Sequence, residues 1–499
     1  MSDEAGVRLR TARGRWVLTA AVLGSAIAFI DAVVVGIAQP TIGREFHVDV
    51  AALQWVTIGY MLTLSGLLLL GGALGDRVGR RRVFLIGIVW FAVASLLCAV
   101  APNVVVLIIA RAVQGIGGAL LTPGSLAILE ATYVPDDRSS AIGAWSGLGG
   151  IAGAVAPFLG GYLIAAVSWR LIFLINLPIA AAVVILTLRH VPESRDTEET
   201  GRLDFAGTAL IVIALVGLSY ALVEGPAIGF GVGAVLVSLL GGVVAFVLFV
   251  VTESRVREPV VPLSLFSSRQ FSVTNVVTLL IYGVLGVMLF LLPIQLQQVS
   301  HYSPLAAGAA LLPVTAIMLL LSARSGRIAS RIGPRLQMSV GPIVVAIGVF
   351  LYSRIDASGN YLTEVLPAVM AFGLGLAITV APLTSTAMSS APARRAGLAS
   401  AINNTVARTG SLLAVAVVPP IVGIAGDAYL HPAVFEAGFR SAVFIGALVC
   451  AAGGVIAAAG IRNARRATPV VERRPDYHCA LDAPPLRDED EQPVVSTAS

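Results

Sequence analysis

Two charged residues stand alone inside long apolar stretches of the sequence. Asp31 lies in the segment FIDAVVVGIAQP, and Arg111 lies in the segment LIIARAVQGIGG. A charge at the centre of a bilayer costs at least ~2.5 kcal/mol, so such a side chain normally faces a wet cavity, takes up a proton or pairs with an opposite charge. Asp31 can therefore load and unload a proton, and Arg111, which keeps its charge, is its natural partner. A structural role in helix packing is the alternative for each residue.

A second polar patch is expected in another apolar stretch. Arg408 follows Asn403 and Asn404 by about one helical turn. Functional and structural roles are equally open for this patch, because intramembrane polar residues serve both. Tyr60 and Gln114 lie deep enough in their own stretches to line a cavity, as do Asn404 and Arg408.

No pattern in the sequence indicates an enzyme, a cofactor or a bound metal. Cys98 and Cys450 lie in apolar stretches, Cys479 lies near the C-terminal end, and the five histidines are dispersed. Neither a disulfide nor a metal-ligand spacing emerges from this distribution. The glycine-rich segments are apolar and open onto no lysine, which excludes a phosphate-binding loop. We expect a protein that is not an enzyme and that uses no cofactor.

The composition predicts the fold class. Hydrophobic residues make up 57% of the chain and charged residues only 12%, whereas a soluble globular protein carries about 25% charged residues. The chain is therefore predicted to be an all-α polytopic membrane protein. Its net charge of +5 comes from arginines scattered through short loops, which argues against a nucleic-acid partner.

Fourteen apolar runs are long enough to span a hydrocarbon core about 30 Å thick. They cover approximately residues 16–38, 52–74, 83–101, 104–126, 140–165, 170–189, 205–223, 231–252, 271–295, 304–323, 337–353, 362–387, 398–424 and 439–461. The first run is too long for a cleavable signal peptide and is interpreted as an uncleaved span. Of the 33 arginines, four fall on one side of this topology, two inside spans and the other 27 on the side of the termini. The positive-inside rule then places both termini in the cytoplasm.

A polar island between the second and third runs has the sequence GALGDRVGRRR. Its glycines permit a tight turn and its charges cannot lie in hydrocarbon, so it is predicted to be a cytoplasmic loop. The residues singled out in it are Gly72, Gly75, Asp76, Arg77, Gly79, Arg80 and Arg81. A similar island, GRIASRIGPR, lies between the tenth and eleventh runs. Aligning the islands makes runs 1 to 6 equivalent to runs 9 to 14, with two inserted runs, and such internal repeats are typical of secondary transporters.

The fifth run is rich in small residues, among them Gly153, Pro157, Gly160 and Gly161. Small residues let membrane helices approach closely. A close-packing face is the simplest interpretation, and a hinge or dry seam between the two halves is the sharper one.

Taken together, these motifs resemble those of the 14-helix drug:proton antiporter family of the major facilitator superfamily, over about residues 16–461. The resemblance rests on the Asp31 segment, the GALGDRVGRRR island, Arg111 with Gln114, Pro157 with Gly160 and Gly161, and Arg408. It implies two six-helix bundles with two inserted helices, and export of small amphipathic molecules by alternating access, driven by inward proton flow. In that family picture Asp31 carries the proton and Arg111 tunes it. The resemblance also implies a cytoplasmic latch between the bundles, formed by Asp76, Arg80, Arg81 and Arg138.

The expected organisation has five parts: a cytoplasmic N-terminal segment, an N-terminal bundle, linkers with two inserted helices, a C-terminal bundle and a disordered cytoplasmic tail. They cover residues 1–15, 16–190, 191–270, 271–461 and 462–499. We predict a proton-coupled exporter of drugs or secondary metabolites, monomeric, in the cytoplasmic (inner) membrane. A dedicated transporter of one solute, such as a siderophore, amino acid or lipid-like metabolite, is the alternative. A non-transporting scaffold is less favoured because it needs no costly intramembrane charges.

Overall fold

The computed structural model describes residues 6–195, 203–256, 259–392 and 395–463. Within these ranges fourteen helical segments are long and apolar enough to cross a membrane, which confirms the predicted number. The helices of the N-terminal half are α1 (Ala12–Phe46), α2 (Val50–Val78), α3 (Arg80–Ala99), α4 (Val104–Thr132), α5 (Pro135–Ala166), α6 (Leu171–Leu174) and α7 (Asn176–His190). Two inserted helices follow, α8 (Phe205–Ile228) and α9 (Gly233–Arg255). Those of the C-terminal half are α10 (Arg269–Ile294), α11 (Pro304–Ala310), α12 (Leu312–Ile332), α13 (Pro334–Leu351), α14 (Leu366–Ser389), α15 (Ala396–Ile421) and α16 (Pro432–Gly460).

Several helices extend beyond the apolar runs that predicted them. The helix α1 was expected over 16–38, but it starts four residues earlier, where Thr11 accepts a hydrogen bond from the backbone of Gly14, and it ends at the left-handed cap His47. Hydrophobicity marks only the part of a helix inside the hydrocarbon core, whereas capping groups set where it ends. The sixth span is divided into α6 and α7, and the tenth into α11 and α12. The tail predicted to be disordered lies almost entirely outside the described residues.

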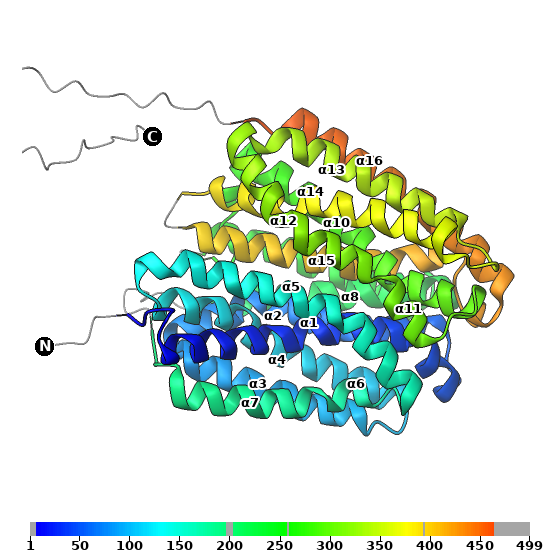
Figure 1. Cartoon of the computed structure of the whole chain (residues 1–499). Helices are drawn as coiled ribbons and strands as arrows, with labels where there is room; N and C mark the ends of the chain where they lie inside the picture. Colours follow the sequence, from blue (N-terminus) through cyan, green and yellow to red (C-terminus); the bar gives the residue numbers. More distant parts are fainter. Residues whose placement is uncertain (1–5, 196–202, 257–258, 393–394, 464–499) are drawn as a thin grey trace, which may run out of the picture.

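The two halves pack their helices in the same pattern (Figure 1). In the N-terminal half, α1 contacts α5 and α7, and α4 contacts α2 and α3. The corresponding helices of the C-terminal half do the same, with α10 against α15 and α16, and α14 against α12 and α13. Each half is therefore a six-span bundle, as expected from the alignment of the two polar islands.

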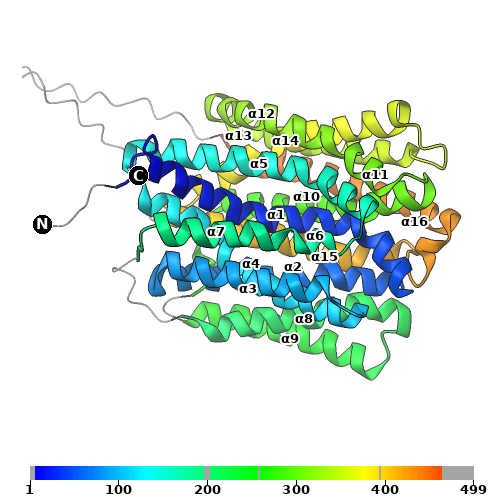
Figure 2. The same ribbon diagram turned by 60° about the horizontal axis from the view of Figure 1, so that its bottom comes forward.

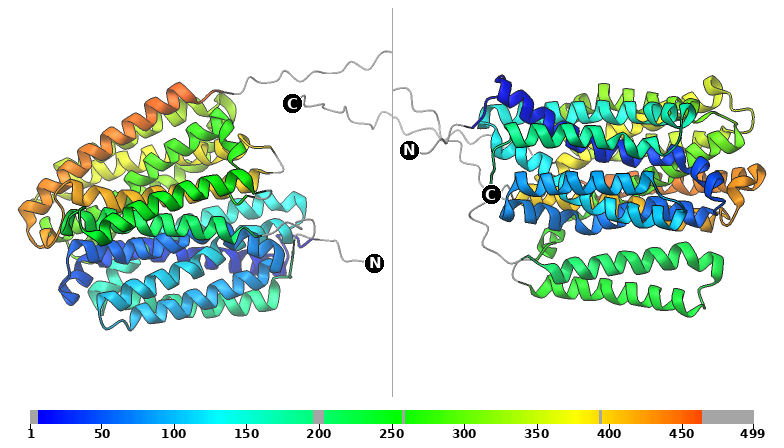
Figure 3. Two further views of the ribbon diagram at one scale, coloured as in Figure 1. Left: turned by 180° about the vertical axis from the view of Figure 1, so that it is seen from behind. Right: turned by 90° about the horizontal axis from the view of Figure 1, so that it is seen from below.

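The inserted helices α8 and α9 form a hairpin beside the bundles (Figures 2 and 3). The helix α8 packs against α2 and α15, one helix from each bundle. Its approach to α2 requires Gly66, because a Cβ atom there would lie 2.7 Å from Cγ2 of Val212. The indole of Trp55 in α2 also donates a hydrogen bond to Glu224 of α8 at 2.8 Å. The hairpin thus covers one of the seams between the bundles.

The hydrogen bonds between the bundles are concentrated at one end of the molecule. The start of α1 and the end of α16 lie at the same end of the molecule, which we call the terminal side (Figure 1). The turn between α1 and α2 lies at the opposite end, which we call the far side. Among the described residues, all hydrogen bonds between the two bundles lie on the far side. Gln54 donates to the carbonyl oxygen of Val415 at 2.6 Å, and Gln297 donates to that of Ile37 at 2.9 Å. The far side is therefore closed.

The helix α5 shows where the bundles separate. Gly161 packs on Pro304 of α11, whose carbonyl oxygen leaves no room for a Cβ atom. Gly143 lies five helical turns earlier on the same face, yet nothing lies within 4 Å of a Cβ atom built there. The same is true of Gly147 and Gly153. Among the described glycines of α5, the close packing on the other bundle therefore lies at the far-side end of the helix, and the glycines nearer the terminal side have no such contact.

We expect the substitution Gly161→Ala to open the far side, because its methyl group must displace the backbone of α11. The matched change Gly143→Ala meets open space and should leave the closure intact. The measurement is the distance between spin labels at Val167→Cys and Leu362→Cys, two exposed far-side positions. It should lengthen only in Gly161→Ala, and an equal distance in both variants would contradict the proposed seam.

Candidate functional site

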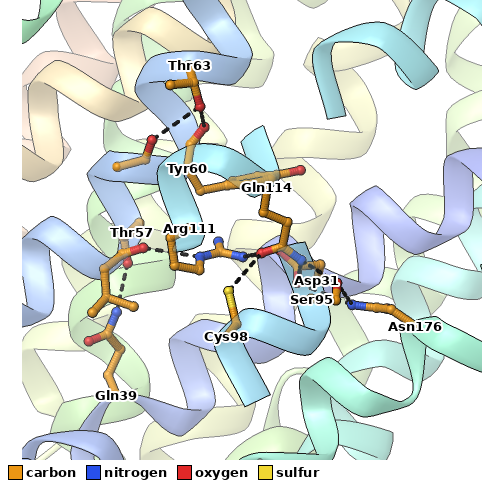
Figure 4. A network of polar contacts seen from close by, with 12 residues as sticks. Asp31, Gln39, Thr57, Tyr60, Thr63, Ser95, Cys98, Arg111, Gln114 and Asn176 are labelled. Carbon is orange, nitrogen blue, oxygen red and sulfur yellow. Dashed lines mark hydrogen bonds and ion pairs between the residues drawn. The ribbon is translucent and has the colours of Figure 1, made fainter. Parts of the chain in front are cut away.

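The predicted partners Asp31 and Arg111 form an ion pair inside the N-terminal bundle (Figure 4). Asp31 projects from α1 and Arg111 from α4, and each residue is only 1% exposed. Removal of both charges from water is costly, and the pair persists only if further hydrogen bonds satisfy its remaining donors and acceptors. The next contacts supply those bonds.

The carboxylate of Asp31 is held by amide side chains as well as by arginine. Gln114 of α4 donates to Oδ1 of Asp31 at 2.9 Å, and Asn176 of α7 donates to the same oxygen at 3.5 Å. Both amides also donate to the hydroxyl of Ser95 in α3, at 2.8 Å and 3.2 Å. Four helices therefore meet at one carboxylate, and both of its oxygens accept hydrogen bonds.

The guanidinium of Arg111 is held from the opposite direction by α2. Its Nε donates to the backbone carbonyl oxygen of Val56 at 3.2 Å. Its Nη1 also donates to the side-chain oxygen Oε1 of Gln114, in its own helix α4, at 2.6 Å. Its central carbon lies 4.3 Å from the centroid of the Tyr60 ring. A cation over an aromatic face in a desolvated setting adds about 2 kcal/mol of attraction. Arg111 is thus fixed by one carboxylate, one backbone carbonyl, one side-chain amide oxygen and the rings of Tyr60 and Phe173.

Glycines in α4 bring these groups together. A Cβ atom at Gly115 would collide with the backbone carbonyl of Tyr60 in α2, and one at Gly117 would lie 2.7 Å from the backbone nitrogen of Phe91 in α3. Because both neighbours are backbone atoms, they cannot move aside as a flexible side chain could. The spaced glycines that follow Arg111 in the sequence therefore let α4 lie close enough to α2 and α3 for the polar network to close.

Two of the residues expected to line a cavity are buried in this network instead. Tyr60 is 1% exposed and Gln114 is 0% exposed, because the first stacks on Arg111 and the second bridges Asp31 to its neighbours. In contrast, Asn404 is exposed and Arg408 is only partly buried. Depth in an apolar run indicates membrane depth, but it does not distinguish a residue facing its own bundle from one facing a cavity.

Ser95 and Asn176 were missed as site residues. Each is a polar side chain with apolar neighbours on both sides within a long apolar run, which is the signal that could have found them. Serine and asparagine are common enough in membrane helices that this signal needs spatial confirmation.

The polar island GALGDRVGRRR, at the junction of α2 and α3, contacts other residues of the N-terminal bundle. Asp76 forms an ion pair with Arg80 at 2.7 Å, and Arg81 donates to the carbonyl oxygen of Leu188 in α7 at 2.8 Å. Arg138 donates to the carbonyl oxygen of Tyr133 at 3.0 Å. The expected latch to the C-terminal bundle is therefore not formed among the described residues in this conformation, in which the interbundle hydrogen bonds lie on the far side.

The turn of this loop depends on glycine. Gly79 separates α2 from α3 with φ of 126°, a backbone conformation that favours glycine. A Cβ atom at this position would also lie 2.7 Å from the carboxylate of Glu193, which pairs with Arg82 at 3.7 Å. Arg77 lies in the last turn of α2, and its Nε is buried without a partner among the described residues. Gly72 and Gly75 lie in the last two turns of α2 and carry no such strain.

Two pseudo-repeated bundles, a buried charge pair and a seam closed at one end define a class of protein, the secondary transporters of the membrane. The chain belongs to the Major Facilitator Superfamily, whose family model matches residues 21–415.

Curated relatives agree with this assignment. The chain is 35% identical over 409 residues to the tetracenomycin C resistance and export protein of Streptomyces glaucescens, covering 81% of this chain and 76% of the relative. It is 34% identical over 417 residues to the multidrug resistance protein Stp of Mycobacterium tuberculosis, covering 83% of this chain and 77% of the relative. A puromycin resistance protein of Streptomyces alboniger is 35% identical over 423 residues, covering 83% of each chain.

Solved structures confirm the fold. A peptide transporter, POT, crystallised with sulfate, superposes with a TM-score of 0.64 at 15% identity, covering 90% of this chain and 98% of that one. A bacterial homologue of the human lysosomal transporter Spinster, in an inward-facing and unoccupied conformation, gives a TM-score of 0.63 at 14% identity, covering 90% of this chain and 97% of that one.

The ion pair should appear as a strong coupling in protein stability. Loss of one member of a buried pair costs about 3–5 kcal/mol because it leaves the other charge unpaired. We expect Asp31→Asn and Arg111→Gln each to lower the melting temperature of the protein in detergent. The double variant should melt well above the value that simple addition of the two losses gives. Strictly additive losses would show that the two charges do not stabilise one another.

Proposed function

We propose that this protein is a proton-coupled exporter of small amphipathic molecules, working by alternating access of its two bundles. The observation that carries the proposal is the buried pair of Asp31 and Arg111 inside a transporter fold. A membrane protein retains intramembrane charges when they serve a pathway or a coupling step. The relatives named for resistance to, or export of, drugs and antibiotics support the choice of substrates.

In this proposal Asp31 is the proton carrier and Arg111 its fixed counter-charge. A carboxyl group can take up a proton, whereas the guanidinium keeps its charge. Protonation of Asp31 removes the negative member of the pair and weakens its hold on Gln114 and Asn176. Because these partners come from α4 and α7, the change in charge alters the contacts of α1 with its neighbours. That change biases the bundle between its two conformations.

We propose that the protein lies in the cytoplasmic (inner) membrane as a monomer, with its terminal side towards the cytoplasm. The arginine distribution supports this orientation. The described conformation then faces the cytoplasm, from which an exporter loads its substrate. We expect small molecules, protons and lipid to be its only partners, and no enzymatic activity or cofactor.

The alternative function is a dedicated transporter for one physiological solute. Among the described spans, Asp31 is the one carboxylate near the middle of a helix, and its charge is already neutralised by Arg111. A polyspecific exporter of organic cations needs further carboxylates facing its substrate, so broad cation export is the least supported part of the proposal. A non-transporting scaffold is disfavoured by the cost of the buried charges.

The proposal predicts dye uptake into inverted membrane vesicles energised by a pH gradient. Vesicles with wild-type protein should accumulate ethidium or rhodamine 19, and an uncoupler should abolish the accumulation. Asp31→Asn should reduce it to the background of vesicles without the protein, because the amide cannot carry a proton. Asp427→Asn is the matched control, since Asp427 is an exposed far-side carboxylate. Uptake of neither dye by folded wild type would favour the dedicated transporter, and uptake that survives Asp31→Asn would remove Asp31 from the coupling path.

A further inference from the structure

Arg408 carries a positive charge in the middle of the membrane without a counter-charge. It lies near the centre of α15, about 18 Å from either end of the helix at 1.5 Å per residue. It is only partly buried, and the structure gives it no ion pair, hydrogen bond or stacked ring within the described residues. Val415 lies about two helical turns further along the same face of α15, and its carbonyl oxygen accepts a hydrogen bond from Gln54 of α2 in the other bundle. Arg408 therefore lies on the face of α15 that is turned towards the N-terminal bundle.

The carboxylate of Asp31 is not available to Arg408 in this conformation. Asp31 is enclosed, and its two oxygens accept hydrogen bonds from Arg111, Gln114 and Asn176. In the part of the C-terminal bundle that the structure describes, the carboxylates lie at the far-side end, at Asp356, Glu364, Asp427 and Glu436. Among the described residues, the middle of the membrane-spanning helices of the two bundles therefore carries two guanidinium groups, Arg111 and Arg408, and one carboxylate, Asp31.

The surroundings of Arg408 provide neutral hydrogen-bonding groups. Asn404 lies one turn earlier on the same face of α15 and is exposed, with its amide nitrogen bonded to the carbonyl oxygen of Ser400. Tyr282 of α10 is partly buried, and its backbone carbonyl oxygen accepts a hydrogen bond from Ser411, which lies about one helical turn beyond Arg408. The neighbouring Asn403 points elsewhere, because it donates to Asn275 and Thr278 of α10 and holds the bundle together. The second polar patch thus divides into a structural part at Asn403 and a second part, Asn404 and Arg408, whose side chains make no hydrogen bond to another helix among the described residues.

We propose that Arg408 binds an acidic group of the substrate, a carboxylate or an acidic phenol, in the conformation open to the terminal side. This inference rests on the proposed function and names the substrate class. A guanidinium presents a planar fork of donors that matches a carboxylate in two parallel hydrogen bonds. An anionic substrate supplies the missing counter-charge, whereas a cationic substrate adds a second uncompensated charge. The exporter therefore prefers amphipathic acids to their neutral or cationic analogues.

Rhodamine 19 and its ethyl ester, rhodamine 6G, test this preference because they differ only in the free carboxyl group. We expect the wild-type protein in detergent to bind rhodamine 19 about tenfold more tightly than rhodamine 6G, as measured by fluorescence anisotropy. Arg408→Gln should weaken binding of the acid to the level of the ester and leave the ester unchanged. Arg408→Lys should retain part of the preference, since it keeps the charge but loses the fork.

Arg440→Gln is the control for loss of positive charge, because Arg440 lies at the far side and pairs with Glu436. It should leave the acid-to-ester ratio unchanged. Equal affinities for the two dyes in wild type would overturn the inference while leaving export intact. A second result would also overturn the inference: an unchanged acid-to-ester ratio in Arg408→Gln together with loss of proton-driven uptake of both dyes. That result would indicate that Arg408 pairs with Asp31 in another conformation rather than with the substrate. Binding of neither dye by folded wild type would contradict the proposed function, and the inference would fall with it.

Discussion

The ion pair between Asp31 and Arg111 is the interaction on which the N-terminal bundle is built. It places two charges where the surrounding hydrocarbon offers no solvation, and α1, α2, α3, α4 and α7 all contribute groups that satisfy them. Such a buried polar centre is stable only when every hydrogen-bonding partner is in position. Loose packing of these helices would therefore lower the stability of the bundle. The glycines of α4 make this close packing possible, because they have no side chain at the contacts with α2 and α3.

The need of both buried charges for partners on several helices explains why the ion pair can couple to a change of conformation. The carboxyl group is the one member whose charge can vary, and its partners belong to α4 and α7, against which α1 packs. The helix α1 also reaches the other bundle through Ile37 on the far side. A change at Asp31 therefore acts on a helix that contributes directly to the closed seam, with only about two helical turns between the two positions.

Different parts of this picture were accessible from the sequence to different degrees. The fourteen spans and the repeat could be predicted because long apolar runs and paired polar islands report directly on membrane insertion. The pairing of Asp31 with Arg111 was a natural expectation, since an isolated charge in hydrocarbon needs a partner. Two features were not accessible from the sequence: the burial of Tyr60 and Gln114, and the lack of an interbundle contact at Asp76 among the residues that the structure describes. They depend on helix rotation and on conformation. The contribution of Ser95 and Asn176 was also hidden, since neither carries a charge that demands explanation.

The most direct test of the account is whether substrate movement drives proton movement through Asp31. Proteoliposomes containing the protein, a trapped pH-sensitive dye and no initial pH gradient would be given a gradient of rhodamine 19. The account predicts that wild type moves protons against the flow of the dye, and that Asp31→Asn, reconstituted to the same level, moves none. Dye flow without proton movement in wild type, or equal proton movement in Asp31→Asn, would contradict the central claim.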